Sequence, residues 1–138
     1  MTRRCHAIVL LALLLALPAA RLSAQRPIVC GDDRKRETIR GLLDRMMRSD
    51  DSTARSSRRT LRLPRVHPDS VIYVDDPRVC ERAANVYYRD QLGPRPLHGV
   101  AVARVRDLYV VYGYIRAGEW VPLVVYNSAF ETLAGILM

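Results

Sequence analysis

The chain has 138 residues and a formal net charge of +8, with 22 Lys and Arg against 14 Asp and Glu. This length excludes an array of several domains, because one domain typically takes about 100–200 residues. The positive charge favours anionic partners and does not by itself indicate any reaction.

The first 24 residues have the three parts of a secretory signal peptide. Arg3 and Arg4 make the start positive, an uncharged apolar run extends from Ala7 to Leu17, and Ala24 places a small residue at the cleavage position. We therefore expect residues 1–24 to be a signal peptide.

Two other N-terminal signals fit less well. A membrane anchor needs about 20 apolar residues, which is longer than this run. A lipoprotein signal is disfavoured because residues 27–29 place no small side chain next to Cys30. We expect residues 25–138 to form one secreted or periplasmic domain with no stable membrane span.

Two cysteines, Cys30 and Cys80, remain after cleavage. An even pair in an exported protein predicts a disulfide bond. The alternative is a nucleophilic Cys80 with His67 or His98 as its base, but a bridged cysteine has no free thiolate to react. The sequence favours the disulfide.

Two helices are predicted. Residues 33–48 repeat apolar side chains every three or four positions, which is the spacing of one helical face. A second helix begins with Asp76 as N-cap and Pro77 at its first position, and it ends before Gly93.

The segment between the two helices is predicted to be less ordered. Residues 49–60 are rich in Arg and Ser and nearly free of apolar side chains, so we expect a mobile loop. Leu61, Leu63 and Val66 then alternate with polar residues, and Pro64 places this short strand at a sheet edge.

Strands dominate the rest of the chain. β-branched and aromatic residues in alternation predict strands at residues 71–74, 100–105, 108–115 and 120–126. Arg106 and Asp107 suit a two-residue turn poorly, so we expect a longer or bulged link. Pro122 predicts an edge position for the last of these strands.

These elements predict an α+β domain. Two main helices pack on a small antiparallel sheet of three to four strands, in the order α-β-α-β-β-β. Residues 108–115 are apolar on both sides, which predicts a central strand with one face beneath the helices and the other partly covered. Ser128 and Glu131 have capping-box spacing and predict a short C-terminal helix.

Two groups of residues are candidate binding surfaces. Clustered arginines favour an anionic polymer, a lipid headgroup or an acidic protein face, and nucleic acid is disfavoured because residues 49–70 carry no aromatic side chain for base stacking. The members of this cluster are Arg55, Arg58, Arg59, Arg62 and Arg65. Exposed aromatic side chains with polar groups are typical of recognition surfaces. Tyr112, Tyr114 and Trp120 are candidates for such a surface.

No motif in the chain specifies a reaction. A metal site would have to use His67, Asp69, Asp75, Asp76 and His98, which lack the spacing of zinc ligands. The acidic residues that remain as catalytic candidates, Asp90, Asp107, Glu119 and Glu131, are explained as turn and helix-end residues.

We therefore predict no catalytic residue, no metal and no cofactor. The expected function is that of an exported, disulfide-stabilised, non-catalytic binding or accessory domain of the cell envelope or extracellular space. Its expected partner is a protein or an anionic envelope component. The alternative is a small secreted hydrolase that uses His98 and a nearby carboxylate.

Overall fold

The computed structural model describes residue 30 and residues 33–92, 99–114 and 122–137. The predicted signal peptide, residues 1–24, lies outside this part of the chain. The helical elements are α2 (Asp33–Arg48), α3 (Ser52–Thr60), the short η1 (Pro68–Ser70), α4 (Pro77–Tyr87) and the π-helical turn η2 (Tyr88–Leu92). The strands are β1 (Ile72–Val74), β2 (Gly99–Val105), β3 (Leu108–Tyr114), β4 (Pro122–Tyr126) and β5 (Thr132–Leu137).

The five strands form one antiparallel sheet in the order β1-β2-β3-β4-β5. This confirms the α+β class and the central position of β3, with more strands than the three to four expected. Each strand pairs with its neighbour in the chain. Short described turns join β2 to β3 and β4 to β5, and the connection from β1 to β2 includes α4.

The register of the strands defines two faces of the sheet. Ala103, Val110 and Val125 lie opposite one another and therefore share one face. Tyr73 of β1 pairs with Ala103 on this face, and the Arg40 guanidinium of α2 lies 4.7 Å from the centre of the Tyr73 ring. We call this the hairpin face, because α2 and α3 cover it.

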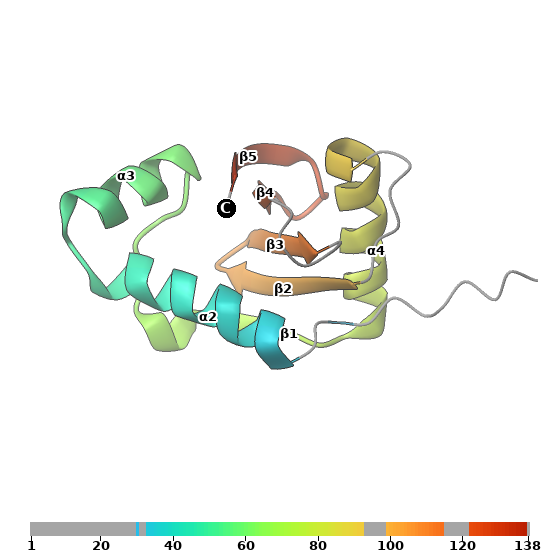
Figure 1. Cartoon of the computed structure of the whole chain (residues 1–138), viewed down its shortest axis with the longest axis horizontal. Helices are drawn as coiled ribbons and strands as arrows, with labels where there is room; N and C mark the ends of the chain where they lie inside the picture. The colour runs from blue at the N-terminus through green and yellow to red at the C-terminus, as the bar shows by residue number, and fades with distance from the viewer. Residues whose placement is uncertain (1–29, 31–32, 93–98, 115–121, 138) are drawn as a thin grey trace, which may run out of the picture.

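Helix α4 covers the opposite face, which we call the α4 face. Its central row is Val102, Val111 and Val124, and Gly113 stands two residues from Val111 on the same side. The ring of Tyr87 from α4 fills the space above Gly113. The helices thus lie on two faces of the sheet (Figure 1), which corrects our expectation that they share one.

The two main helices form as predicted. In α2 the apolar stripe is buried, including Ile39 and Leu43, which are fully covered. Helix α4 begins with the Asp76 carboxylate accepting from the Arg78 N–H at 2.8 Å, and Pro77 occupies its first position. Both helices therefore follow their sequence signals.

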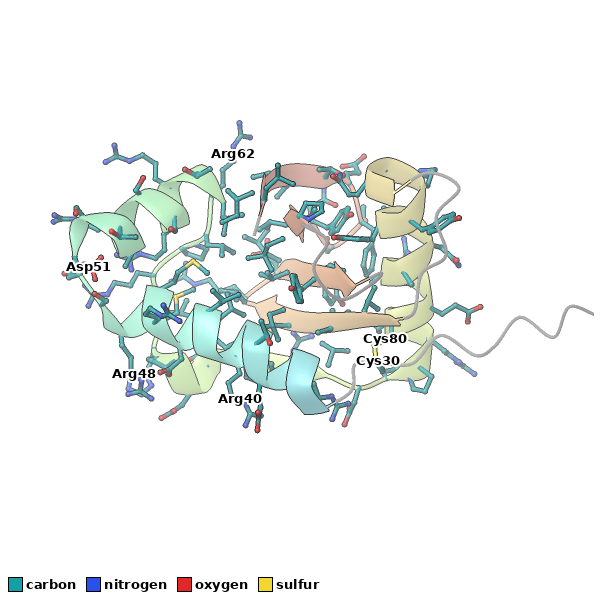
Figure 2. All side chains as sticks on the ribbon, in the orientation of Figure 1. Cys30, Arg40, Arg48, Asp51, Arg62 and Cys80 are labelled. Carbon is teal, nitrogen blue, oxygen red and sulfur yellow. A yellow bond between two sulfur atoms is a disulfide. The ribbon has the colours of Figure 1, made fainter. Side chains whose placement is uncertain are left out.

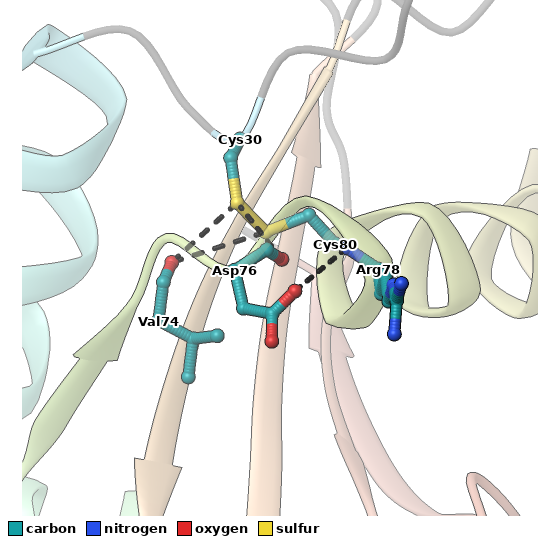
Figure 3. The surroundings of a disulfide bond; sticks show 5 residues. All are labelled: Cys30, Val74, Asp76, Arg78 and Cys80. Carbon is teal, nitrogen blue, oxygen red and sulfur yellow. Dashed lines mark hydrogen bonds between the residues drawn. A yellow bond between two sulfur atoms is a disulfide. The ribbon is translucent and has the colours of Figure 1, made fainter.

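The predicted disulfide between Cys30 and Cys80 is confirmed. The two Cα atoms are 5.5 Å apart, which is a normal separation for this bond. Both sulfur atoms contact the carbonyl oxygen of Val74 at the end of β1, at 3.6 and 3.9 Å (Figure 3). Because Cys30 precedes α2 and Cys80 lies in the first turn of α4, the bridge links the two helical layers around the β1 edge.

The prediction of a mobile loop at residues 49–60 is wrong. Residues 52–60 form α3, although this helix has little apolar content. It is stabilised by its N-cap and by contacts with the end of α2, neither of which a hydrophobic pattern records. The strand expected around Leu61 and Leu63 is also absent from this described segment, because both side chains are buried in the core in irregular backbone.

The predicted C-terminal helix is also wrong, because residues 132–137 form β5. Phe130 adopts φ = 63°, a left-handed conformation that interrupts a helix. The Asn127 side-chain oxygen accepts from the N–H groups of Ala129 and Glu131, each at 2.9 Å, which folds the segment into a turn. The chain then returns along β4.

Two further expectations about the strands need correction. β4 lies between β3 and β5, so it is not an edge strand, and Pro122 is tolerated because it is the first residue of the strand. The link between β2 and β3 has only two residues, since Val105 pairs with Leu108. Arg106 makes this possible by adopting φ = 55°, as the first central residue of a tight hairpin turn requires.

The packing of Tyr87 on Gly113 predicts opposite effects for two glycine substitutions. A Cβ atom on Gly113 would overlap the ring of Tyr87, so Gly113→Ala is expected to lower the free energy of unfolding by about 1–3 kcal/mol. Gly41 lies in α2, where an added Cβ would meet nothing within 4 Å, so Gly41→Ala is expected to raise that free energy by up to about 1 kcal/mol. Denaturant titration measures both. Equal stability of Gly113→Ala and the parent would contradict this packing.

Candidate functional site

The predicted arginine cluster lies on and after α3, which follows α2 as the second half of a helical hairpin. Asp51 is the N-cap of α3. Its carboxylate accepts from the Ser49 hydroxyl at 2.5 Å and from the Ala54 N–H at 2.7 Å, and these bonds hold the pKa of Asp51 below its ordinary value. The negative charge of the ionised Asp51 carboxylate also interacts favourably with the positive end of the helix dipole.

One side of α3 is buried against the rest of the protein. Ala54, Arg58 and Leu61 follow one another at spacings of four and three residues, and each is less than 10% exposed. Two of them are apolar, and Arg58 is the one charged residue among the buried side chains of the described residues. Arg58 therefore belongs to the packing of the hairpin and does not face a partner.

Arg58 fixes α3 to the end of α2. Its guanidinium donates to the carbonyl oxygen of Met46 and, at 2.9 Å, to that of Ser49. It also forms an ion pair with Asp50 at 3.3 Å. The last carbonyl groups of a helix have no partner within the helix. The Arg58 guanidinium, which comes from the neighbouring helix, is the hydrogen-bond donor for the carbonyl group of Met46.

Three exposed arginines lie on the other side of α3 and directly after it. Arg55 and Arg59 are four residues apart in the helix, and Arg62 follows the helix end with a left-handed φ of 54°. We call these three residues the outer arginine stripe. None of the three forms an ion pair with a described residue. Figure 2 shows Arg62 projecting away from the body of the protein. Arg65, the fifth predicted residue, is instead paired with Asp50 at 2.8 Å.

The surroundings of the outer arginine stripe keep its charge available. Two acidic residues directly precede α3. Asp50 already contacts two arginines, and Asp51 caps the helix, where the nearby Arg55 charge also helps to lower the pKa of its carboxyl group. Arg59 lies in the last turn of α3, where the negative end of the helix dipole stabilises a cation. Guanidinium groups bind carboxylate and phosphate through paired N–H donors, so this surface suits either group.

The predicted aromatic surface is only partly within the described residues. Tyr112 lies on the hairpin face and is 9% exposed, and its burial raises the pKa of the hydroxyl. The side chain of Tyr114 and all of Trp120 lie outside the described part. On the α4 face, Tyr109 stacks on Phe130 with ring centres 4.7 Å apart.

The candidates for catalysis are separated or occupied. Cys80 is bridged, so it has no thiol for the cysteine-nucleophile alternative. His67 is exposed, and its Nδ1 accepts from the Asp69 N–H at 3.3 Å. Within the described residues, no group of three or more His, Cys, Asp or Glu side chains is placed to hold a metal ion. His98 lies outside the described residues.

The acidic candidates also have structural partners. Asp90 pairs with Arg89 at 2.7 Å, and Asp107 lies in the turn between β2 and β3. The Glu131 carboxylate accepts from the Asn127 side-chain amide at 2.6 Å. Glu119 lies outside the described residues.

A small cleft between α2, α3 and β5 was missed by the sequence analysis. Its volume is about 170 Å³, and its apolar walls come from Leu42, Met46, Ala54 and Ile136, with Arg45 at the rim. The apolar spacing of residues 33–48 includes the two side chains from α2. The position of Ile136 in the cleft could not be predicted, because residues 132–137 were expected to be helical.

No protein-family model matches this chain, and neither a curated protein nor a solved structure matches it. Among the described helices, none is long and apolar enough to cross a membrane.

The two sides of α3 predict different effects for adjacent arginines. Arg58→Ala removes a buried guanidinium that bonds two carbonyl groups, and we expect the free energy of unfolding to fall by about 2 kcal/mol. Arg59→Ala removes the same charge from the exposed side, and we expect a change within about 0.5 kcal/mol. Denaturant titration compares the pair. Similar values for both variants would contradict the structural role of Arg58.

Proposed function

We propose that this protein is an exported, non-catalytic binding domain whose outer arginine stripe contacts an anionic partner. The partner is the acidic face of another protein or an anionic component of the cell envelope. The observation that carries this proposal is the set of three exposed arginines that lie on α3 and directly after it and form no ion pair within the described part of the chain.

The contrast with three paired arginines supports the proposal, and clustering within residues 55–62 distinguishes the stripe from single exposed arginines such as Arg78 and Arg104. Arg48 pairs with Asp44 at 2.7 Å, and Arg65 and Arg89 also have acidic partners. An arginine that is already in an ion pair must give up that pair before it can bind an anionic partner. The members of the outer arginine stripe have no such partner among the described residues, so binding an anion costs them no existing ion pair.

The rigidity of α3 also supports binding through this surface. Arg58 and the Asp51 cap hold the helix in place before any partner arrives. Less conformational entropy is therefore lost when the stripe binds than would be lost by a mobile loop. An arginine loop that ordered only on contact would bind more weakly for the same set of charges.

The proposed export rests on two features. The disulfide between Cys30 and Cys80 is typical of oxidising compartments. The charged start and apolar run within residues 1–24 are typical of a secretory signal. Both favour a location in the periplasm or outside the cell, where anionic lipids, polysaccharides and proteins are accessible.

The test compares two triple variants that remove the same charge. In the first, Arg55, Arg59 and Arg62 are replaced by Gln; in the control, Arg78, Arg104 and Arg106, which are exposed elsewhere, are replaced by Gln. The probes are anionic phosphatidylglycerol vesicles, heparin and poly-glutamate, which separate the lipid, polysaccharide and protein sources of negative charge.

We expect the first triple variant to bind its best probe at least about tenfold more weakly, since each arginine near an anionic surface contributes about 1 kcal/mol. The control should retain binding, and the melting temperature of both should stay close to that of the parent. Equal losses in the two variants would mean that only net charge matters. Failure of the parent to bind any probe would contradict the proposal.

A further inference from the structure

The cleft between α2, α3 and β5 has the size of one apolar side chain. Met46 and Ala54 are its most buried lining residues, at 7% and 5% exposed, and Leu42 and Ile136 are half-buried. Its volume of about 170 Å³ is similar to that of an apolar cavity of about 150 Å³ that binds benzene. The cleft therefore has room for one branched or aromatic group.

The lining of the cleft also includes one positive and one negative side chain. Arg45 comes from the last turn of α2, and Asp51 lies at the start of α3 (Figure 2). The two form no ion pair with each other, and Arg45 has none with any other described residue. The Asp51 carboxylate accepts from Ser49 and Ala54, but a carboxylate has about four acceptor positions. Both charges can therefore pair with a ligand.

These two charges restrict the kind of molecule that fits the cleft. A plain hydrocarbon would cover both charges without giving either a partner, which costs free energy. The carboxylate of a fatty acid would pair with Arg45 but meet a like charge at Asp51, and an alkylamine would have the reverse problem. A small molecule with an apolar body and both charges avoids each of these costs.

We infer that the cleft binds a free α-amino acid with an apolar side chain of about the size of leucine. The side chain of the ligand occupies the apolar part of the cleft, its carboxylate pairs with Arg45 and its ammonium group pairs with Asp51. The hydroxyl groups of Thr53 and Ser57 also line the cleft and can hydrogen-bond to the ligand. No member of the outer arginine stripe lines the cleft, so this site is independent of the proposed function.

The first test compares L-leucine with three analogues that each lack one of its features. N-acetyl-L-leucine has no ammonium group, L-leucinamide has no carboxylate, and L-alanine lacks most of the apolar side chain. The full chain is expressed with its own N-terminal segment and purified from an oxidising compartment. Nuclear magnetic resonance titration then measures the affinity for each compound.

We expect L-leucine to bind with a dissociation constant of about 1 mM or lower. L-alanine should bind at least about tenfold more weakly, because it buries three fewer carbon atoms. L-leucinamide and N-acetyl-L-leucine should each bind about threefold more weakly or worse, since each loses one ion pair at the rim.

The second test assigns each charge of the ligand to its partner on the protein. Arg45→Gln should weaken L-leucine about threefold and leave L-leucinamide unchanged. Asp51→Asn should weaken L-leucine similarly and leave N-acetyl-L-leucine unchanged, and asparagine still caps the helix. Arg48→Gln is the matched control, because Arg48 lies in the same last turn of α2 but does not line the cleft. It should retain the parent affinity.

Three results would overturn the inference. The first is the absence of saturable binding of L-leucine up to about 10 mM. The second is equal binding of L-leucine and both singly charged analogues, which would make the cleft a purely apolar site. The third is an equal loss of L-leucine affinity in Arg45→Gln and Arg48→Gln, which would mean that only net charge matters.

Discussion

The arrangement of the helices depends on one covalent constraint, the bridge between Cys30 and Cys80. The residues it joins stand at the starts of α2 and α4, which cover opposite faces of the sheet, so the bond passes around the β1 edge where the sheet is narrowest. β1 has only three residues and offers few ladder hydrogen bonds. The bridge therefore holds both helices beside the shortest strand of the sheet.

A second, polar constraint supports the proposed binding surface. The buried side of α3 is held by Arg58, and the exposed side carries the outer arginine stripe, so neighbouring arginines in the sequence have different roles. The guanidinium that binds carbonyl groups inside the hairpin makes α3 a rigid platform for those outside. This short helix therefore contributes both to the stability of the protein and to the proposed binding surface.

The elements with strong local signals were predictable from the sequence. Helices α2 and α4, strands β1 to β4 and the disulfide all follow from apolar spacing, caps and cysteine parity. The arginine cluster was also found, but α3 was missed because Arg58 occupies an apolar position of its stripe and counts as polar in any pattern. β5 was missed because its apolar residues fit a helix as well as a strand, and pairing with β4 decides between them. No local signal placed the two helices on opposite faces.

The most direct test of this account is the stability of the protein without its bridge. The variant with Cys30→Ser and Cys80→Ser is compared with the oxidised parent by denaturant titration and hydrogen exchange. The bridge closes a loop with a sequence separation of 50 residues, for which chain entropy predicts a loss of about 4 kcal/mol on removal. We expect this loss together with faster exchange in both α2 and α4. A loss below about 1 kcal/mol with unchanged exchange would contradict the central role of the bridge.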